Sequence, residues 1–328
     1  MAAAYLGRGI ARRETLQPDF RFIVGTPEGG SPCPCLLAGA RGICDYRLSR
    51  ALTMPPFQRY RLATLFASLC VAATPTSRAE TRSITPSECL AMKAKNVISE
   101  KSPIGCNRLK RVSFRYVNFD GETRMGEVAV LDAVSRRTQI IFDSLYSIGF
   151  PLNKAALLED YLGDDDASMN DNNTSAFSAR AIAGSQEWSL HAFGVAIDVN
   201  PFQNPFIYFD NETSVAHIIP ASSSRISVNR QNYRPNKDFR PGMAEEVIDI
   251  FAYNGFLNWG GYWNFPIDYQ HFEVGNRDFV MRLAKASPSD AEQLFEEYIH
   301  RYVSCVTQLT PKQAREAARA ACVSRMTQ

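Results

Sequence analysis

Two short segments of this sequence carry histidine and aspartate side chains that could bind a metal ion. In SLHAFGVAIDVN, His191 precedes Asp198, and in DYQHFE, Asp268 lies three positions before His271. Two imidazoles and one carboxylate suit zinc, and three protein ligands leave one position open for water. Zinc lowers the pKa of such a water to about 7, which gives a nucleophile at neutral pH. Asp268 would then lie beside this water as a general base.

Neither segment is decisive when it is taken alone. A single histidine beside a strand is more often a core or surface residue than a metal ligand. The Asp-x-x-His spacing places Asp268 and His271 on one side of a turn or of a helix start, where this spacing is also common as a cap. The presence of both segments in one chain is what points to a specific class of protein.

Together the two segments resemble the M15 family of zinc peptidases, which contains D-Ala-D-Ala carboxypeptidases, related dipeptidases and L-alanyl-D-glutamate endopeptidases. The family pattern, S-x-H-x-x-G-x-A-x-D followed by D/E-x-x-H, is matched at Ser189, His191, Gly194, Ala196, Asp198, Asp268 and His271. The resemblance covers about residues 130–275. It implies that His191, Asp198 and His271 bind Zn²⁺. By the same resemblance, Asp268 is the general base.

The resemblance also implies a catalytic arginine. The family keeps an arginine upstream of the first ligand, where it stabilises the oxyanion or binds a substrate carboxylate, and Arg180 has this position. A surface arginine is the alternative interpretation. Many relatives have Cys-Arg here, whereas this chain has Ala179-Arg180. We expect this difference to remove a packing or disulfide feature and to leave the chemistry unchanged.

Several other residues have both a functional and a structural interpretation. Glu273 lies two positions after His271, so it could orient that ligand or be an ordinary surface glutamate. Ser175 could contact substrate or form a turn. The tryptophans that could line the substrate groove or only pack locally are Trp188, Trp259 and Trp263. His217 and His300 have no partner at a useful spacing, and we interpret both as structural or surface residues.

A strand is predicted to position the first part of the site. Between residues 195 and 200, apolar side chains alternate with Ala196, Asp198 and Asn200. This alternation predicts a strand with one apolar face and one face of small or polar side chains. His191 precedes Gly194, so the chain can turn there and bring the imidazole beside the Asp198 carboxylate.

Helices are predicted before and after this strand. Apolar residues at helical spacing predict a helix over 131–149. Residues 207–241 resemble a long surface loop, and residues 241–254 a second helix. The C-terminal part predicts two helices, one capped near Ser287 and the other starting at Thr310-Pro311. The M15 resemblance implies an α+β fold: a small antiparallel sheet flanked by helices, as in hedgehog domains and DD-peptidases, with zinc in a cleft on one sheet face.

The chain of 328 residues is predicted to have a leader and one folded domain. From Met54, a basic start, the uncharged run LATLFASLCVAA and small residues predict a signal peptide over 54–79. The run is about half of the ~20 residues that a membrane span needs, so we expect no span after signal cleavage. We interpret residues 1–53 as an upstream segment that results from a wrongly assigned start of translation. The alternative is a disordered tail. Residues 80–328 are then one zinc peptidase domain with a C-terminal helical hairpin.

Charge and cysteine content narrow the class of protein further. Residues 1–79 carry a net charge of +6 and residues 80–328 a net charge of −4. A mildly acidic domain does not attract nucleic acid, so we do not expect a nucleic-acid-binding protein. An even number of cysteines in an exported chain favours disulfides. The four cysteines of the domain allow three pairings, and we favour Cys89–Cys106 and Cys305–Cys322 because each pair closes a short loop.

We therefore expect an exported, monomeric enzyme of the periplasm or cell wall. It would hydrolyse peptide bonds in peptidoglycan stem peptides as an endopeptidase or a DD-carboxypeptidase. The alternative is a zinc-stabilised binding module of the same fold without peptidase activity. Asp268 distinguishes the two, since a binding module needs no general base. A serine hydrolase is disfavoured because the sequence has no GxSxG motif.

Overall fold

The computed structural model describes residues 79–182, 185–210, 213, 215–311 and 314–327. The described residues all belong to one compact unit, Val71–Gln328. The predicted extension (1–53) and all but the last residue of the predicted signal peptide (54–79) lie outside the described residues. None of the helices in the described ranges combines the length and the hydropathy that a membrane crossing requires.

In the described residues, three small antiparallel sheets form the strand framework. The first joins β1 (Glu80–Ser83), β2 (Leu109–Val117) and β3 (Thr123–Leu131) in that order. The second has the order β4-β9-β7, with strands at Ala196–Asp198, His271–Glu273 and Asn258–Trp259. The third has the order β6-β5-β8, with strands at Ala216–Ile219, Phe206–Phe209 and Ile267–Asp268. The predicted α+β class is confirmed, although the strands form three sheets where one was expected.

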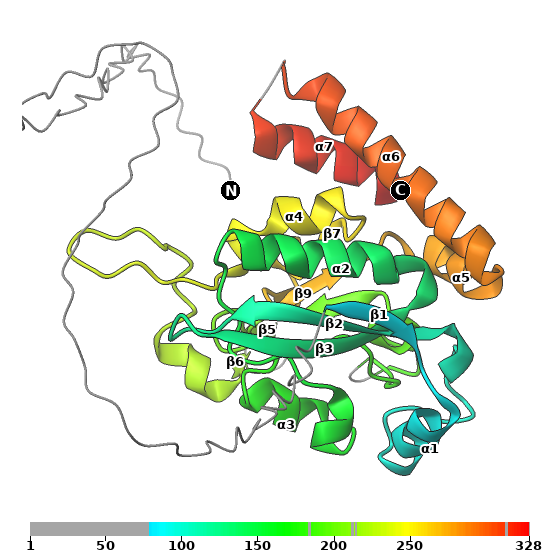
Figure 1. The fold of residues 1–328 in the computed structure, drawn as a ribbon. Coiled ribbons are helices and arrows are strands. Elements are labelled where there is room, and N and C mark those ends of the chain that lie inside the picture. The colour runs from blue at the N-terminus through cyan, green and yellow to red at the C-terminus, as the bar shows by residue number, and fades with distance from the viewer. Residues whose placement is uncertain (1–78, 183–184, 211–212, 214, 312–313, 328) are drawn as a thin grey trace, which may run out of the picture. The chain divides into compact units, whose positions relative to one another are not determined.

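Helix α2 (Asp132–Ser147) follows β3 directly and packs on the first sheet (Figure 1). Phe142 of the helix stacks on Phe114 of β2, with ring centroids 3.6 Å apart. The predicted helix over 131–149 is confirmed, and Gly149 ends it with a positive φ of 70°. The apolar residues that the helix buries include Val134, Ile141 and Leu145.

Four further helices lie in the C-terminal part of the described residues. They are α4 (Ile248–Tyr253), α5 (Arg277–Lys285), α6 (Pro288–Leu309) and α7 (Arg315–Thr327). Helix α6 packs against α2, and α7 packs against α6 (Figure 1). Ser287 caps α6 by accepting a hydrogen bond from the Asp290 amide, as predicted. The predicted disulfide Cys305–Cys322, which joins α6 to α7, is confirmed.

Removing the Cys305–Cys322 disulfide should destabilise the domain. The bond closes a loop with a sequence separation of 17 residues, so its loss should lower the free energy of unfolding by about 3 kcal/mol through the greater entropy of the unfolded chain. The double variant Cys305→Ser/Cys322→Ser checks this in urea unfolding, with zinc content measured in parallel as a control. An unchanged unfolding midpoint would contradict the prediction.

The predicted start of the last helix at Thr310 is wrong. Thr310 ends α6, where its amide and its hydroxyl both donate to the carbonyl of Val306, and α7 begins at Arg315. A threonine hydroxyl can bond back to the carbonyl four positions earlier as well as cap a new helix. The Thr-Pro pair therefore marks the break between the two helices without fixing the helix to which the threonine belongs.

The predicted loop over 207–241 and the predicted helix over 241–254 also need correction. The loop region contains most of the β5-β6 hairpin and a 3₁₀ turn at Ala221–Arg225. The helix is shortened to α4, which a separate 3₁₀ turn at Ala244–Glu246 precedes. Four-residue strands between turn-forming residues give little periodic signal, and this is why the hairpin was not predicted.

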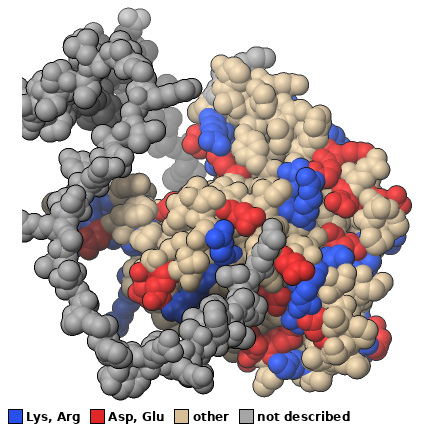
Figure 2. All heavy atoms as spheres, in the orientation of Figure 1, with Lys and Arg blue, Asp and Glu red and all other residues tan. Residues whose placement is uncertain are grey.

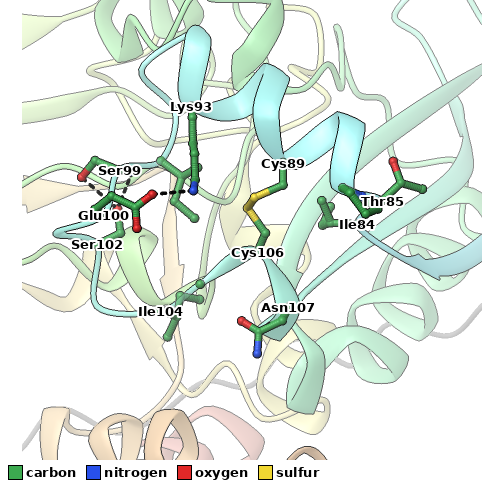
Figure 3. A pocket seen from close by; sticks show the side chains of 13 residues that line it. Ile84, Thr85, Cys89, Lys93, Ser99, Glu100, Ser102, Ile104, Cys106 and Asn107 are labelled. Carbon is green, nitrogen blue, oxygen red and sulfur yellow. Dashed lines mark hydrogen bonds and ion pairs between the residues drawn. A yellow bond between two sulfur atoms is a disulfide. The ribbon is translucent and has the colours of Figure 1, made fainter.

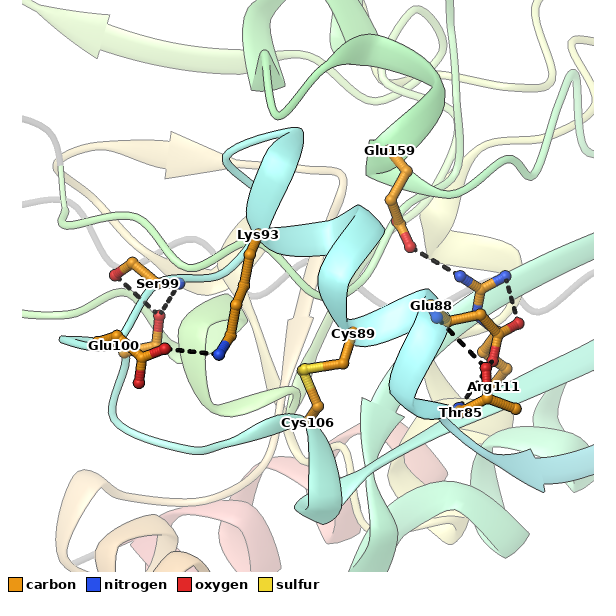
Figure 4. The surroundings of a disulfide bond; sticks show 10 residues. Thr85, Glu88, Cys89, Lys93, Ser99, Glu100, Cys106, Arg111 and Glu159 are labelled. Atoms are coloured by element: carbon orange, nitrogen blue, oxygen red, sulfur yellow. Dashed lines mark hydrogen bonds and ion pairs between the residues drawn. A yellow bond between two sulfur atoms is a disulfide. The ribbon is translucent and has the colours of Figure 1, made fainter.

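Helix α1 (Pro86–Ala94) and the loop after it form a disulfide-bonded unit beside β2. The predicted pair Cys89–Cys106 is confirmed, and it ties α1 to the residues just before β2 (Figure 4). Arg111 of β2 adds ion pairs to Glu88 at 3.3 Å and to Glu159 at 2.9 Å. Two disulfides in one domain are typical of proteins from oxidising compartments.

Candidate functional site

A 3₁₀ turn and a short strand place the first two residues of the predicted metal set. His191 lies in the turn Leu190–Phe193, which Ser189 caps by accepting a hydrogen bond from the His191 amide. Gly194 then turns the chain with a φ of 67°, and a Cβ at this position would meet the backbone of β3 at 2.5 Å. Strand β4 follows and carries Asp198, which is 3% exposed. The glycine of the motif is therefore required by the turn that aims His191.

Strand β9 brings the third residue to the same place. Asp198 of β4 is directly opposite His271 of β9, so both side chains point to one face of the sheet. His271 Nδ1 lies 3.0 Å from Asp198 Oδ1. His191 Nε2 lies 3.2 Å from Asp198 Oδ2 and 3.1 Å from His271 Nδ1. The three ligand atoms all lie within 4.8 Å of one another, and this buried group, named the triad below, could hold a metal ion.

The second nitrogen of each imidazole has a partner of its own. His191 Nδ1 faces the carbonyl of Ala176, and His271 Nε2 lies 2.9 Å from Glu273 Oε2. Both partners accept hydrogen bonds, so each neutral ring carries its proton there and turns its free lone pair towards Asp198. The contact with His271 agrees with the interpretation of Glu273 as a residue that orients a ligand.

Removing the Glu273 carboxylate should weaken metal binding. Partners of this kind fix the orientation of a ligand and increase its basicity, and their loss costs about 10–100-fold in metal affinity. We expect this range for Glu273→Ala, measured by competition of the purified protein with a zinc chelator. Glu187→Ala is the matched control, since Glu187 is an exposed glutamate outside the triad. Equal zinc affinity of the two variants would exclude the orienting role.

Asp268 ends β8 and lies within electrostatic reach of all three residues of the triad. The spacing Asp-x-x-His is thus a turn between two strands, and the helix start that the sequence also allowed does not occur. Among the described residues, Asp268 Oδ1 has no hydrogen-bond partner although it is buried. Burial, and then the Asp198 carboxylate, raise the pKa of Asp268 to about 7. A buried carboxylate oxygen without a partner fits a site that receives water and a cation.

The charges within the triad depend on one another. Burial opposes the charge on Asp198, but His191 and His271 outweigh it and hold the pKa of Asp198 well below its usual value. Burial likewise opposes the charge on His271, whereas hydrogen bonds to Asp198 and Glu273 raise the pKa of His271 well above its usual value. The surroundings therefore favour positive charge beside an ionised carboxylate, and a divalent cation supplies that charge when the imidazole is deprotonated.

Arg180 lies on a segment whose backbone the α1 unit supports. The amide of Ala179 donates to the carbonyl of Val97, in the loop closed by the first disulfide, at 3.2 Å. The Arg180 side chain is 38% exposed, and its Nε lies 2.6 Å from Asp165 Oδ2 at the start of α3 (Asp165–Asn170). Its charge lowers the pKa of Asp268, which places the guanidinium within electrostatic reach of the candidate base.

The structure separates the remaining candidates into different roles. Ser175 is buried and exchanges two backbone hydrogen bonds with Asp198, at 2.8 and 3.0 Å, so its backbone holds β4 in place. Trp259 is 5% exposed and donates to the Tyr269 carbonyl, which makes it a core residue. The Trp263 ring centroid lies 5.4 Å from that of His271, so this tryptophan borders the triad.

The two remaining histidines and the last tryptophan lie outside the triad. Trp188 packs partly buried against the core, and His300 is exposed on α6. His217 is exposed as well, but its ring stacks on Tyr208 with centroids 4.6 Å apart. Sequence spacing did not predict this partner because the contact crosses the β5-β6 hairpin. The aromatic alternation of Phe206 and Tyr208 was the available signal.

A pocket of about 520 Å³ lies elsewhere, between α1 and the loop that follows it (Figure 3). Its lining includes the Cys89–Cys106 disulfide, together with Lys93 and Glu100, which pair with each other. Neither the triad nor Asp268 nor Arg180 lines this pocket. Among the described residues, the side chains that could hold a metal ion are those of the triad and do not line this pocket, so the chemistry of the donor groups places the functional site at the triad.

Comparison with known families gives one match. Residues 183–274 match a family model of M15 peptidases that is described as D-alanyl-D-alanine carboxypeptidase. The matched range contains the triad and Asp268 and begins after Arg180. The recognition of an M15 family peptidase from the sequence is thereby confirmed. Comparisons with curated proteins and with solved structures returned no match.

Proposed function

Because residues 183–274 identify this chain as an M15 family peptidase, we propose that it hydrolyses peptide bonds in the stem peptides of peptidoglycan as a zinc enzyme. The proposal rests on the buried triad of His191, Asp198 and His271. Asp268 lies within electrostatic reach of all three residues. Zinc, when bound, supplies the Lewis acid that lowers the pKa of a water to about 7.

Each residue of the site would have its own role in hydrolysis. His191 Nε2, His271 Nδ1 and an oxygen of Asp198 would hold the zinc, since these are the atoms that the structure brings together. Asp268 would accept the proton of the attacking water at its partnerless Oδ1 and then transfer it to the leaving amine. Arg180 would stabilise the developing oxyanion or bind a carboxylate of the substrate.

Substrate binding would depend on local charges. Acidic and basic side chains are interspersed over the face of the domain that Figure 2 shows. A surface of this kind gives a substrate little long-range attraction, so a carboxylate of the stem peptide needs a nearby cation. Arg180 can provide this cation, because its side chain is partly exposed and within reach of Asp268. The two disulfides support a location outside the cytoplasm, in the periplasm or at the cell wall.

A zinc-stabilised binding module is the competing function. Such a module would need the triad but would have no use for Asp268. Among the described residues, the Asp268 Oδ1 atom is buried without a hydrogen-bond partner, and this cost favours an active role for the carboxylate. We therefore favour the peptidase.

Digestion of isolated sacculi by the zinc-loaded protein tests the proposal. New N-terminal amines in the digest would indicate an endopeptidase, and release of free D-alanine would indicate a carboxypeptidase. Chelation should remove either activity, and added zinc should restore it. A protein with stoichiometric zinc that releases neither product would reject the peptidase in favour of the binding module. Size-exclusion chromatography in the same buffer would test the expected monomer.

A further inference from the structure

The β6-β5-β8 sheet carries a row of aromatic side chains on the same face as the candidate base. Asp268 of β8 is paired with Phe206 of β5, so the two side chains leave the sheet on the same side. Two residues further along β5, Tyr208 points to this side again, and its partner on β6 is His217. The row therefore starts beside Asp268 and continues through Phe206 to the Tyr208–His217 pair (β5 and β6 in Figure 1).

The far end of the row is open to solvent. The rings of Tyr208 and His217 stack with their planes 9° apart, and Tyr208 is 38% exposed. Phe206 contacts Tyr208 with ring centroids 5.9 Å apart. Ile207, which points to the opposite side of β5, is 6% exposed. The opposite side is thus packed at Ile207, although Phe209 further along that side is 37% exposed, while the side that carries Asp268 offers flat aromatic rings with a hydroxyl and ring nitrogens at their edges.

This row lies within reach of a substrate that is bound at the base. A strand advances about 3.4 Å per residue, so Tyr208 lies roughly 7 Å along β5 from the level of Asp268. An extended peptide covers this distance with about two residues. In peptidoglycan, the amino end of each stem peptide is joined to an amino sugar of the glycan strand. The C–H face of a sugar ring packs on aromatic rings, while its hydroxyl and acetamido groups can bond to polar atoms at the ring edges.

We propose that Phe206, Tyr208 and His217 form a subsite for the amino sugar that bears the stem peptide. The inference rests on the proposed function, and it makes the glycan-linked stem peptide a better substrate than the free peptide. It also requires that the cleaved bond lies within about two residues of the sugar. A bond at the distal D-alanine end of the stem would leave the sugar beyond the row.

The kinetic test uses two substrates with the same peptide, one free and one linked to the peptidoglycan disaccharide. The wild-type protein should show a higher kcat/KM for the linked peptide, and Tyr208→Ala should reduce this preference by about tenfold. Tyr233→Ala is the matched control, because Tyr233 is 83% exposed and its ring contacts that of Phe239 in a different segment. It should leave the preference unchanged. Equal losses on both substrates in Tyr208→Ala would indicate a merely structural role and overturn the subsite.

Binding of the disaccharide without its peptide separates this inference from the proposed function. Titration of the zinc-loaded protein, followed by NMR, should give a Kd that Tyr208→Ala and His217→Ala each weaken by about tenfold. Such binding in a protein that cleaves no stem peptide would retain the subsite and reject the peptidase. Hydrolysis without sugar binding that depends on Tyr208, or with release of terminal D-alanine alone, would retain the peptidase and reject the subsite.

Discussion

Asp268→Asn should lose most hydrolytic activity and keep its zinc. We expect kcat on a stem-peptide substrate to fall by about 10³-fold, because an amide cannot accept the proton of the attacking water. The substitution preserves the size of the side chain and removes a carboxylate whose charge burial and Asp198 oppose, so the fold should tolerate it. The measurements are the steady-state rate and the zinc content per protein.

The same exchange at an exposed aspartate gives the control for this prediction. Asp120 lies exposed in the turn between β2 and β3, and Asp120→Asn should retain wild-type activity. Full activity of Asp268→Asn would overturn the proposed mechanism. Loss of zinc together with activity would show that Asp268 acts on the metal site itself and not as a base.

His191→Ala should lose both the zinc and the activity. The variant leaves two of the three ligands, and the Ala176 carbonyl loses the imidazole that now faces it. Because binding to the native state raises stability by mass action, added zinc should raise the unfolding temperature of the wild-type protein but not that of the variant. Metal analysis and thermal unfolding with and without zinc are the two measurements.

A second histidine provides the matched control here. His300 is exposed on α6, far from the triad in sequence, and His300→Ala should bind zinc and respond to it as the wild type does. Stoichiometric zinc in His191→Ala would show that the triad is not the metal site. The His191 variant thus tests metal binding, whereas the Asp268 variant tests the chemistry that follows.

The candidate site could be predicted from sequence because each of its two segments is a short local motif, and the resemblance to the M15 family relates the two. Ser189, His191, Gly194 and Asp198 lie on one turn and one strand, and a register of three residue pairs brings β9 to β4. Alternation along the strand correctly assigned Asp198 to the polar face. Alternation could not show that this face is buried as well, since burial depends on what packs against it.

Features that depend on contacts between distant segments could not be predicted. The ion pair between Arg180 and Asp165 and the stacking of His217 on Tyr208 join residues without any fixed spacing. Strands β2 and β3 pair over their whole length, but each needs the other and α2 to bury its apolar side. Disulfides were the exception, because a short loop between two cysteines limits the choice of partner.

The turn at Gly194 has a practical consequence for work with shorter pieces of this protein. The Leu131 amide donates a hydrogen bond to the Gly194 carbonyl at 2.9 Å. The end of β3 therefore supports the turn that contains His191. A recombinant fragment trimmed to the family match at 183–274 would discard β1 to β3 and α2 and leave the apolar side of β4 in water. Expression boundaries near residues 79 and 327 keep the support and the turn in one piece.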